Sequence, residues 1–156
     1  MRIGVVSDTH GNCDAIQKAV KAVGKVDLWL HAGDYNHDIR YFQKHSDAPI
    51  IAVLGNCDWN KDARPEEFIE VGGKKIWLTH GHQQQVKYGN HDLGWWGRQY
   101  EVDVVIYGHT HIRDITWQDN LLIFNPGSAS LPRDGFACCG LLMIEDGKIS
   151  AEIIDL

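Results

Sequence analysis

Residues 3–10 read Ile-Gly-Val-Val-Ser-Asp-Thr-His, a short apolar run that ends abruptly in polar side chains. A run of this length, rich in Val and Ile, is typical of a buried β-strand. The same pattern recurs four times further along the chain. The later runs are Val26–Leu30, Ile50–Leu54, Lys75–Leu78 and Val104–Tyr107, and each leads into a polar cluster that contains glycine. We therefore expect five strands with chemically active side chains where they end.

Helical patterns separate several of these strands. Asn12 can cap a helix that ends at Gly24 and repeats apolar residues at helical spacing, namely Ile16, Ala19, Val20 and Val23. Shorter helices are expected near Asp38–Lys44 and Asp92–Glu101. Strands that alternate with helices predict an α/β fold with parallel strand pairs.

The last third of the chain has the pattern of hairpins. Ile112–Trp117 is followed by Leu121–Phe124, and Cys138–Glu145 is followed by an Asp-Gly turn and Lys148–Ile154. The segment Val71–Lys74 suggests a third hairpin turn. Parallel and antiparallel strands together favour an α/β (α+β) fold in which two mixed sheets stack as a β-sandwich flanked by helices.

Length and composition limit the classes of protein to which the chain can belong. The chain has 156 residues without a repeat or linker pattern, so we expect one domain over 1–156. Its 15 Lys and Arg against 21 Asp and Glu give a net charge of −6, which makes long nucleic acid an unlikely partner and suits a cation site. The four cysteines form no CxxC pair and predict reduced thiols and a cytoplasmic location. No apolar run reaches the ~20 residues of a membrane span, and no signal peptide is evident.

The polar clusters contain metal-ligand side chains. Ligand sites of open α/β sheets lie at the carboxyl ends of strands, where we find Asp8, His10, Asp34, Asn56, His80, His109 and His111. The pairs Asp8/His10 and His109/His111 have i, i+2 spacing, so in an extended chain each pair would face one centre. Glycines at 33, 55, 81 and 108 are expected where the backbone turns sharply beside the ions.

Seven ligands exceed the needs of one tetrahedral metal and suit two metals that share a carboxylate. Oxygen combined with imidazole favours Mn²⁺, Fe, Zn²⁺ or Ni²⁺ over Mg²⁺ or Ca²⁺.

The ordered motif set resembles that of the calcineurin-like metallophosphoesterases. The motifs are Asp8-x-His10, Gly33-Asp34, Gly55-Asn56-x-Asp58, His80-Gly81-His82 and Gly108-His109-x-His111. The short length, the cysteine in Gly55-Asn56-Cys57-Asp58 and the segment Asn125–Ser128 resemble the small bacterial and archaeal phosphodiesterase branch of that superfamily.

The resemblance implies a ligand set and a reaction. One metal would take Asp8, His10 and His111, the other Asn56, His80 and His109, with Asp34 as the bridge. A hydroxide that bridges the two metals would attack the phosphorus of a small phosphodiester. Mn²⁺ is the first choice for the metal. We expect catalytic roles for Asp34, Asn56 and His82. We expect substrate contacts from Asn12, Cys57 and His82.

Cys57 departs from the superfamily pattern, because many members carry His at this place. A thiol is a weaker hydrogen-bond donor, so we expect dependence on good leaving groups or on another acid such as His82. Asp58 has two interpretations, support of a neighbouring ligand or a plain turn carboxylate. Trp59 could form a pocket wall, and the cations considered for substrate phosphate are Arg98, Arg113 and Arg133.

Two other functions stay open at this point. The protein could be a phosphomonoesterase or protein phosphatase, since the ligand set serves both reactions. It could also be a non-catalytic scaffold of the kind found as a retromer subunit, although all seven positions keep competent ligands. Trp95 and Trp96 predict an exposed patch that could form a homo-oligomer contact.

Overall fold

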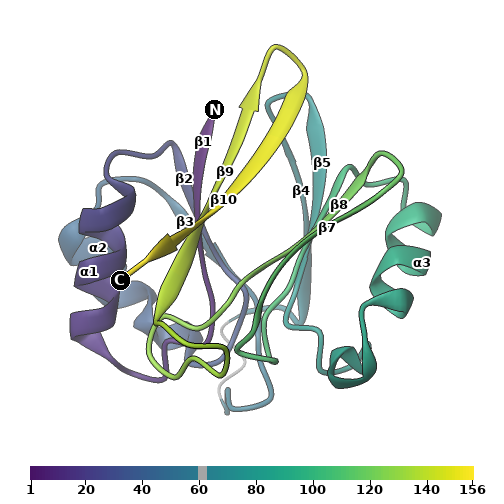
Figure 1. Cartoon of the computed structure of the whole chain (residues 1–156). Helices are drawn as coiled ribbons and strands as arrows, with labels where there is room; N and C mark the ends of the chain where they lie inside the picture. The colour runs from purple at the N-terminus through teal and green to yellow at the C-terminus, as the bar shows by residue number, and fades with distance from the viewer. Residues whose placement is uncertain (60–62) are drawn as a thin grey trace.

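The computed structural model describes residues 1–59 and 63–156, and the strands of this part form two five-stranded mixed sheets stacked face to face (Figure 1). The first sheet has the order β10-β9-β1-β2-β3 and the second the order β4-β5-β6-β8-β7. The bounds in the first sheet are β1 Arg2–Val6, β2 Leu28–His31, β3 Ile50–Ala52, β9 Cys138–Glu145 and β10 Lys148–Asp155. Those in the second are β4 Glu66–Val71, β5 Lys74–Thr79, β6 Val104–Ile106, β7 Arg113–Gln118 and β8 Leu121–Pro126. The predicted sandwich of mixed sheets is confirmed.

Helices cover the outer faces of both sheets (Figure 1). Helices α1 (Cys13–Val23) and α2 (Ile39–His45) pack on the first sheet, and α3 (His91–Gln99) packs on the second. Two single 3₁₀ turns, η1 (Asn36–Asp38) and η2 (Val86–Tyr88), lie in the connections. The α1 helix begins where predicted, because Asn12 Oδ1 accepts a hydrogen bond of 3.0 Å from the Ala15 amide.

Three apolar clusters fill the spaces between the four layers. The largest lies between the sheets and includes Ile3, Val5, Leu30, Ile76, Leu78 and Phe124. The second joins α1 and α2 to the first sheet around Trp29 and Phe42, and the third joins α3 to the second sheet around Trp77 and Leu93. Each fully buried large side chain contributes roughly 1.5–3 kcal/mol, so these layers hold the strand ends in fixed positions.

Strand direction brings the polar clusters to one end of the sandwich. Strands β1, β2 and β3 are parallel, and so are β5, β6 and β8. The three predicted hairpins are confirmed as the antiparallel pairs β4/β5, β7/β8 and β9/β10. The loops that follow the parallel strands meet at the lower end of the molecule in Figure 1. In the described part of the chain, no helix has the length and apolarity needed to cross a membrane.

Candidate metal centre

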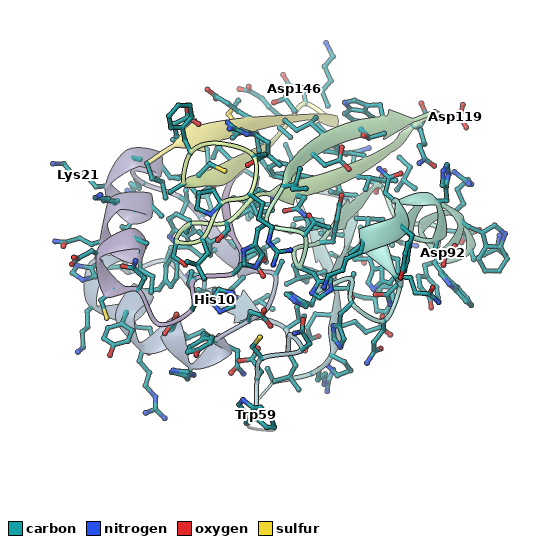
Figure 2. All side chains as sticks on the ribbon, turned by 60° about the horizontal axis from the view of Figure 1, so that its bottom comes forward. His10, Lys21, Trp59, Asp92, Asp119 and Asp146 are labelled. Atoms are coloured by element: carbon teal, nitrogen blue, oxygen red, sulfur yellow. The ribbon has the colours of Figure 1, made fainter. Side chains whose placement is uncertain are left out.

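Four of the predicted ligands gather into one cluster. The ligand atoms of Asp8, His10, Asp34 and His111 all lie within 4.8 Å of one another. Asp8 and Asp34 are almost fully buried, and His10 is the most accessible member of the group. These side chains come from the loops after β1, β2 and β6, and Figure 2 shows His10 on the face that these loops form.

The backbone at several of these ligands is left-handed. The extended conformation expected from the sequence is wrong at these positions. Asp8, His10, His109 and His111 have φ angles of 53°, 48°, 68° and 58°, because β1 ends at Val6 and β6 at Ile106. Asp and His are among the residues that tolerate this conformation best. Asp8 and His10 nevertheless share one centre. His109 and His111 face different centres. The centre of the His109 ring is 5.0 Å from that of His80, whereas the centre of the His111 ring is 5.2 Å from that of His10.

The remaining ligands lie on the other side of Asp34. His80 Nε2 is 3.1 Å from Asn56 Oδ1 and 3.4 Å from Asp34 Oδ1. The second carboxylate oxygen of Asp34, Oδ2, is 3.7 Å from His10 Nε2. Asp34 therefore presents one oxygen to each half of the cluster.

Two histidines are held in the orientation of a metal ligand. His80 Nδ1 lies 2.7 Å from the carbonyl of Ala32, and His111 Nδ1 lies 2.6 Å from the carbonyl of Leu131. A carbonyl only accepts, so Nδ1 carries a hydrogen, and Nε2 is the nitrogen that each ring turns toward the cluster.

The Nε2 atoms of both rings face acceptors. His111 Nε2 is 3.1 Å from Asp8 Oδ1, a buried oxygen that has no well-aligned hydrogen-bond partner among the described residues. Acceptors in contact require a cation or an added proton between them. The donor set of buried carboxylate oxygens and Nε2 atoms therefore fits divalent metal ions.

Charge in the cluster favours cation binding. Burial alone would raise the pKa of Asp8, but the close approach of His111 and the nearby His80 lower it below its ordinary value. Asp8 in turn raises the pKa of His111. Burial, followed by the proximity of His80, lowers the pKa of His109 to about 4, so this ring is neutral near pH 7 and its lone pair is available.

Further contacts fix the ligand loops. Asp8 Oδ2 accepts hydrogen bonds from Ser7 Oγ at 2.5 Å and from the His109 amide at 3.1 Å. The carboxylate of Asp58 accepts from the amides of Gly55 and Asn36, both at 2.8 Å. Asp58 thus supports the backbone of the loop that carries Asn56.

The segment Asn125–Ser128 packs beneath the cluster. Ser128 Oγ donates to the Asp8 carbonyl at 2.9 Å, and Asn125 Nδ2 donates to the Gly108 carbonyl at 3.0 Å. Both side chains are completely buried. This segment therefore positions the loops that carry Asp8 and His109.

Sequence analysis missed a buried network around His31. His31 Nδ1 accepts from the Gly33 amide at 3.2 Å, and its Nε2 lies 3.0 Å from Thr9 Oγ1. Thr9 Oγ1 donates to Asp38 Oδ2 at 2.6 Å, and that oxygen also accepts from the Gly11 amide at 2.9 Å. The network joins the loop of Asp8 and His10 to the loop of Asp34. No spacing pattern links these residues, so nothing in the sequence singled them out.

The four glycines of the site have two different roles. Gly33 and Gly81 have φ angles of 92° and 93°, as predicted for sharp turns. Gly55 and Gly108 begin turns closed by the Asp58 and Thr110 amides, but they lack positive φ, so a left-handed backbone is not what requires glycine there. A Cβ at Gly108 would overlap Ser7 Oγ, and one at Gly55 would overlap the Asp34 carboxylate, so these positions require glycine for space.

His82 lies beside the second half of the cluster. Its ring centre is 5.4 Å from that of His80 and 6.0 Å from that of His109. Its Nδ1 is buried without a hydrogen-bond partner among the described residues. Burial and the nearby His80 lower the pKa of His82, so the ring is neutral near pH 7.

The other two predicted substrate contacts differ in their surroundings. The Cys57 amide donates to Asp34 Oδ1 at 2.9 Å, and burial, together with the Asp34 charge, raises the pKa of the thiol to about 11. The thiol is therefore protonated at neutral pH and is no nucleophile. Asn12 is exposed and its Oδ1 caps α1, so its contact with substrate stays a prediction.

Four further residues were considered as a pocket wall or as cations for the substrate phosphate. Trp59 is 96% exposed and projects from the margin of the loop face in Figure 2, so its predicted role as a pocket wall is wrong. Arg113 is paired with Asp134 and Asp155 and is not free for a phosphate. Arg98 donates to Gln118 on the α3 side. The Arg133 amide, in contrast, donates to the His111 carbonyl at 3.0 Å, next to the cluster.

Trp95 and Trp96 are 51% and 41% exposed, which confirms the predicted exposed patch; its role in oligomer formation stays a prediction.

Two stacked mixed sheets with this His and Asp cluster at the strand ends define the class of the metallophosphoesterases. The sequence model of the calcineurin-like phosphoesterase superfamily domain matches residues 1–147, and the chain belongs to this superfamily.

Individual relatives agree with this assignment. Phosphodiesterase MJ0936 of Methanocaldococcus jannaschii is 35% identical over 160 aligned positions, which cover 91% of this chain and 87% of the relative. The crystal structure of a predicted phosphoesterase from Streptococcus pneumoniae superposes with a TM-score of 0.84 at 28% identity, covering 99% of this chain and 88% of that one. The zinc complex of Vps29 from Entamoeba histolytica, with a TM-score of 0.77, 23% identity and 99% of each chain covered, shares the fold.

Proposed function

We propose that the protein is a phosphodiesterase that uses two divalent transition-metal ions and acts on small phosphoesters. The observation that carries the proposal is Asp34, whose two carboxylate oxygens face opposite halves of the cluster. Asp34 would bridge an ion held by Asp8, His10 and His111 and an ion held by Asn56, His80 and His109. Mn²⁺ is the first choice, with Ni²⁺, Zn²⁺ and Fe as alternatives.

The bound ions would supply an activated water and would neutralise charge that develops on the phosphate. The chain itself supplies orientation. Carbonyl groups lock the rings of His80 and His111, and Ser7 and the His109 amide hold the carboxylate of Asp8. A cluster that is held in place before the ions and substrate bind loses little free energy to reorganisation during the reaction.

His82 is the residue best placed to contact the substrate. Its neutral ring lies beside His80 and His109, and its Nδ1 has no partner within the described part of the chain. The side chain is partly exposed, so a phosphate oxygen or the leaving group would bond to the ring at its accessible edge and not at the buried Nδ1. Cys57 is a weak donor, and the reaction should therefore favour esters whose leaving group needs little protonation.

A diester substrate is favoured over a monoester by two observations. The relative from Methanocaldococcus jannaschii, which matches over most of the chain, is named a phosphodiesterase. The weak donor at Cys57 also gives little help to the departure of a poor leaving group. The four cysteines, all free in the described chain, support the proposed cytoplasmic location.

The test is hydrolysis of bis(p-nitrophenyl) phosphate and p-nitrophenyl phosphate by metal-stripped protein, with Mn²⁺, Ni²⁺, Zn²⁺ or Mg²⁺ restored singly. We expect metal-dependent cleavage of the diester, with the monoester slower. Faster monoester cleavage would replace the proposal by a phosphomonoesterase. Absence of turnover in protein that binds two ions would favour a scaffold, the alternative raised by the fold that the chain shares with Vps29.

A further inference from the structure

Two aromatic rings extend from the metal cluster toward solvent. The Tyr35 ring lies beside the His10 ring, with centres 5.2 Å apart and planes inclined by 57°. The His37 ring follows at 5.3 Å from Tyr35, and its side chain is 52% exposed. We call the pair Tyr35 and His37 the aromatic shelf.

The backbone holds the shelf in a fixed position. Tyr35 has φ 67° and ψ 51° directly after Asp34 at φ 61°, and a bulky residue in this region carries a conformational cost. The Tyr35 carbonyl accepts from the Asp38 amide at 2.9 Å, and the next amide, of Asn36, donates to Asp58 at 2.8 Å. These two bonds fix the backbone of the residue that carries the ring.

The Tyr35 side chain is only partly covered by its neighbours. Gly11 faces it, and a Cβ at that glycine would lie 3.5 Å from Tyr35 Cδ1 and Cε1. Because glycine has no side chain, Gly11 brings only backbone near this edge of the ring. Tyr35 is accordingly half-buried, although Asp34 before it and Asn36 after it are both buried.

We propose that the aromatic shelf binds a planar aromatic group, aryl or nucleobase, that is attached to the phosphorus-bearing group of the substrate. The inference rests on the proposed function, since it takes the phosphate to be held at the metal cluster. A group joined to that phosphate by one or two bonds lies within reach of the Tyr35 ring, whose centre is 5.2 Å from that of the His10 ring. Planar groups gain binding free energy by stacking on Tyr and His rings.

The experiment is titration calorimetry of Mn²⁺-loaded protein with phenylphosphonate and methylphosphonate. Both ligands present the same phosphonate group and neither is hydrolysed, so binding is measured without turnover. We expect the native chain to prefer phenylphosphonate. Tyr35→Asn removes the ring and keeps a residue that tolerates positive φ, so phenylphosphonate should bind about five- to tenfold more weakly while methylphosphonate changes less than about twofold.

Two control variants separate stacking from other effects. Tyr35→Phe keeps the ring and should preserve the preference for phenylphosphonate. Trp95→Leu removes an exposed ring on α3, away from the loop face, and should change neither affinity. A non-hydrolysable nucleoside phosphonate distinguishes the two sources of the planar group: a parallel loss in Tyr35→Asn assigns a nucleobase, and a loss confined to phenylphosphonate assigns a small aryl group.

The proposal is overturned if the native chain binds both phosphonates equally, or if Tyr35→Asn changes both affinities by the same factor. This result is distinct from a failure of the proposed function. A chain that stacks the phenyl ring yet hydrolyses no phosphoester would keep the shelf and reject the phosphodiesterase.

Discussion

Asp34 is the residue on which the two halves of the cluster depend. Its Oδ1 lies near His80 and also accepts a hydrogen bond from the Cys57 amide, while its Oδ2 lies near His10. Replacement of this carboxylate affects both halves at once, whereas loss of any other proposed ligand affects one.

We predict that Asp34→Asn lowers diester turnover by more than about 100-fold, because the amide loses the negative charge and one of the two ligand oxygens. The remaining amide oxygen can still accept from Cys57, so the fold should be retained. The measurement is kcat at saturating Mn²⁺. Asp27→Asn, the same change at an exposed residue that contacts Arg2, should leave turnover unchanged. Near-normal turnover in Asp34→Asn would contradict the bridging role.

Helix α1 depends on one side chain at its start. Asn12 caps this helix, and sequence analysis also predicted that it contacts substrate. We expect Asn12→Ala to lower the free energy of unfolding by about 1 kcal/mol, and Asn12→Ser to lower it much less, because serine also caps. Urea unfolding measures both. A raised KM in both variants without loss of stability would show that substrate contact, and not capping, is the main role.

The segment under the cluster is a second element with a defined role. Ser128→Ala leaves the Asp8 carbonyl and the Leu131 amide without the hydroxyl that now bonds both. We predict a loss of about 1–3 kcal/mol in unfolding free energy together with weaker Mn²⁺ binding. Denaturation and calorimetry test the two effects. Ser150→Ala, on the exposed side of β10, is the matched control, and an identical response of both variants would refute the positioning role.

These elements also show how far the sequence predicts the structure. Strands, hairpins and the α1 cap follow patterns within a few neighbouring residues, and they were predicted correctly. The left-handed backbone at Asp8 and His109 was not, because it depends on contacts with other loops. The bonds between Thr9, His31 and Asp38 join residues 22 and 29 positions apart, and no local pattern encodes them. Local periodicity thus predicts helices and strands, whereas the orientation of the ligand side chains is determined by contacts that exist only in the folded molecule.

The buried His31 couples the folding of the whole molecule to pH. Burial lowers the pKa of His31 below its ordinary value, so the unfolded chain binds the proton more readily than the folded chain. Its contribution makes the folded state more stable above about pH 6.5, and this stability is lost as the pH falls below that value.

We predict that metal-free His31→Gln loses less unfolding free energy than the native chain between pH 7.5 and pH 5.5, the difference being at most about 1.4 kcal/mol per pH unit. Urea titrations at the two values, with a chelator present, give the comparison. A native chain and variant with the same pH dependence would show that His31 does not carry this coupling.

The cluster is divided by Asp34 into two halves. Its geometry depends on the stacked sheets and the parallel strand ends, and on support from His31, Asp58 and Ser128. The most direct test of this account is the number of Mn²⁺ ions bound per chain, measured by elemental analysis after dialysis at pH 7.5. Two ions per native chain are predicted, with fewer than two in Asp34→Asn. One ion or none in the native chain would contradict a site that Asp34 bridges.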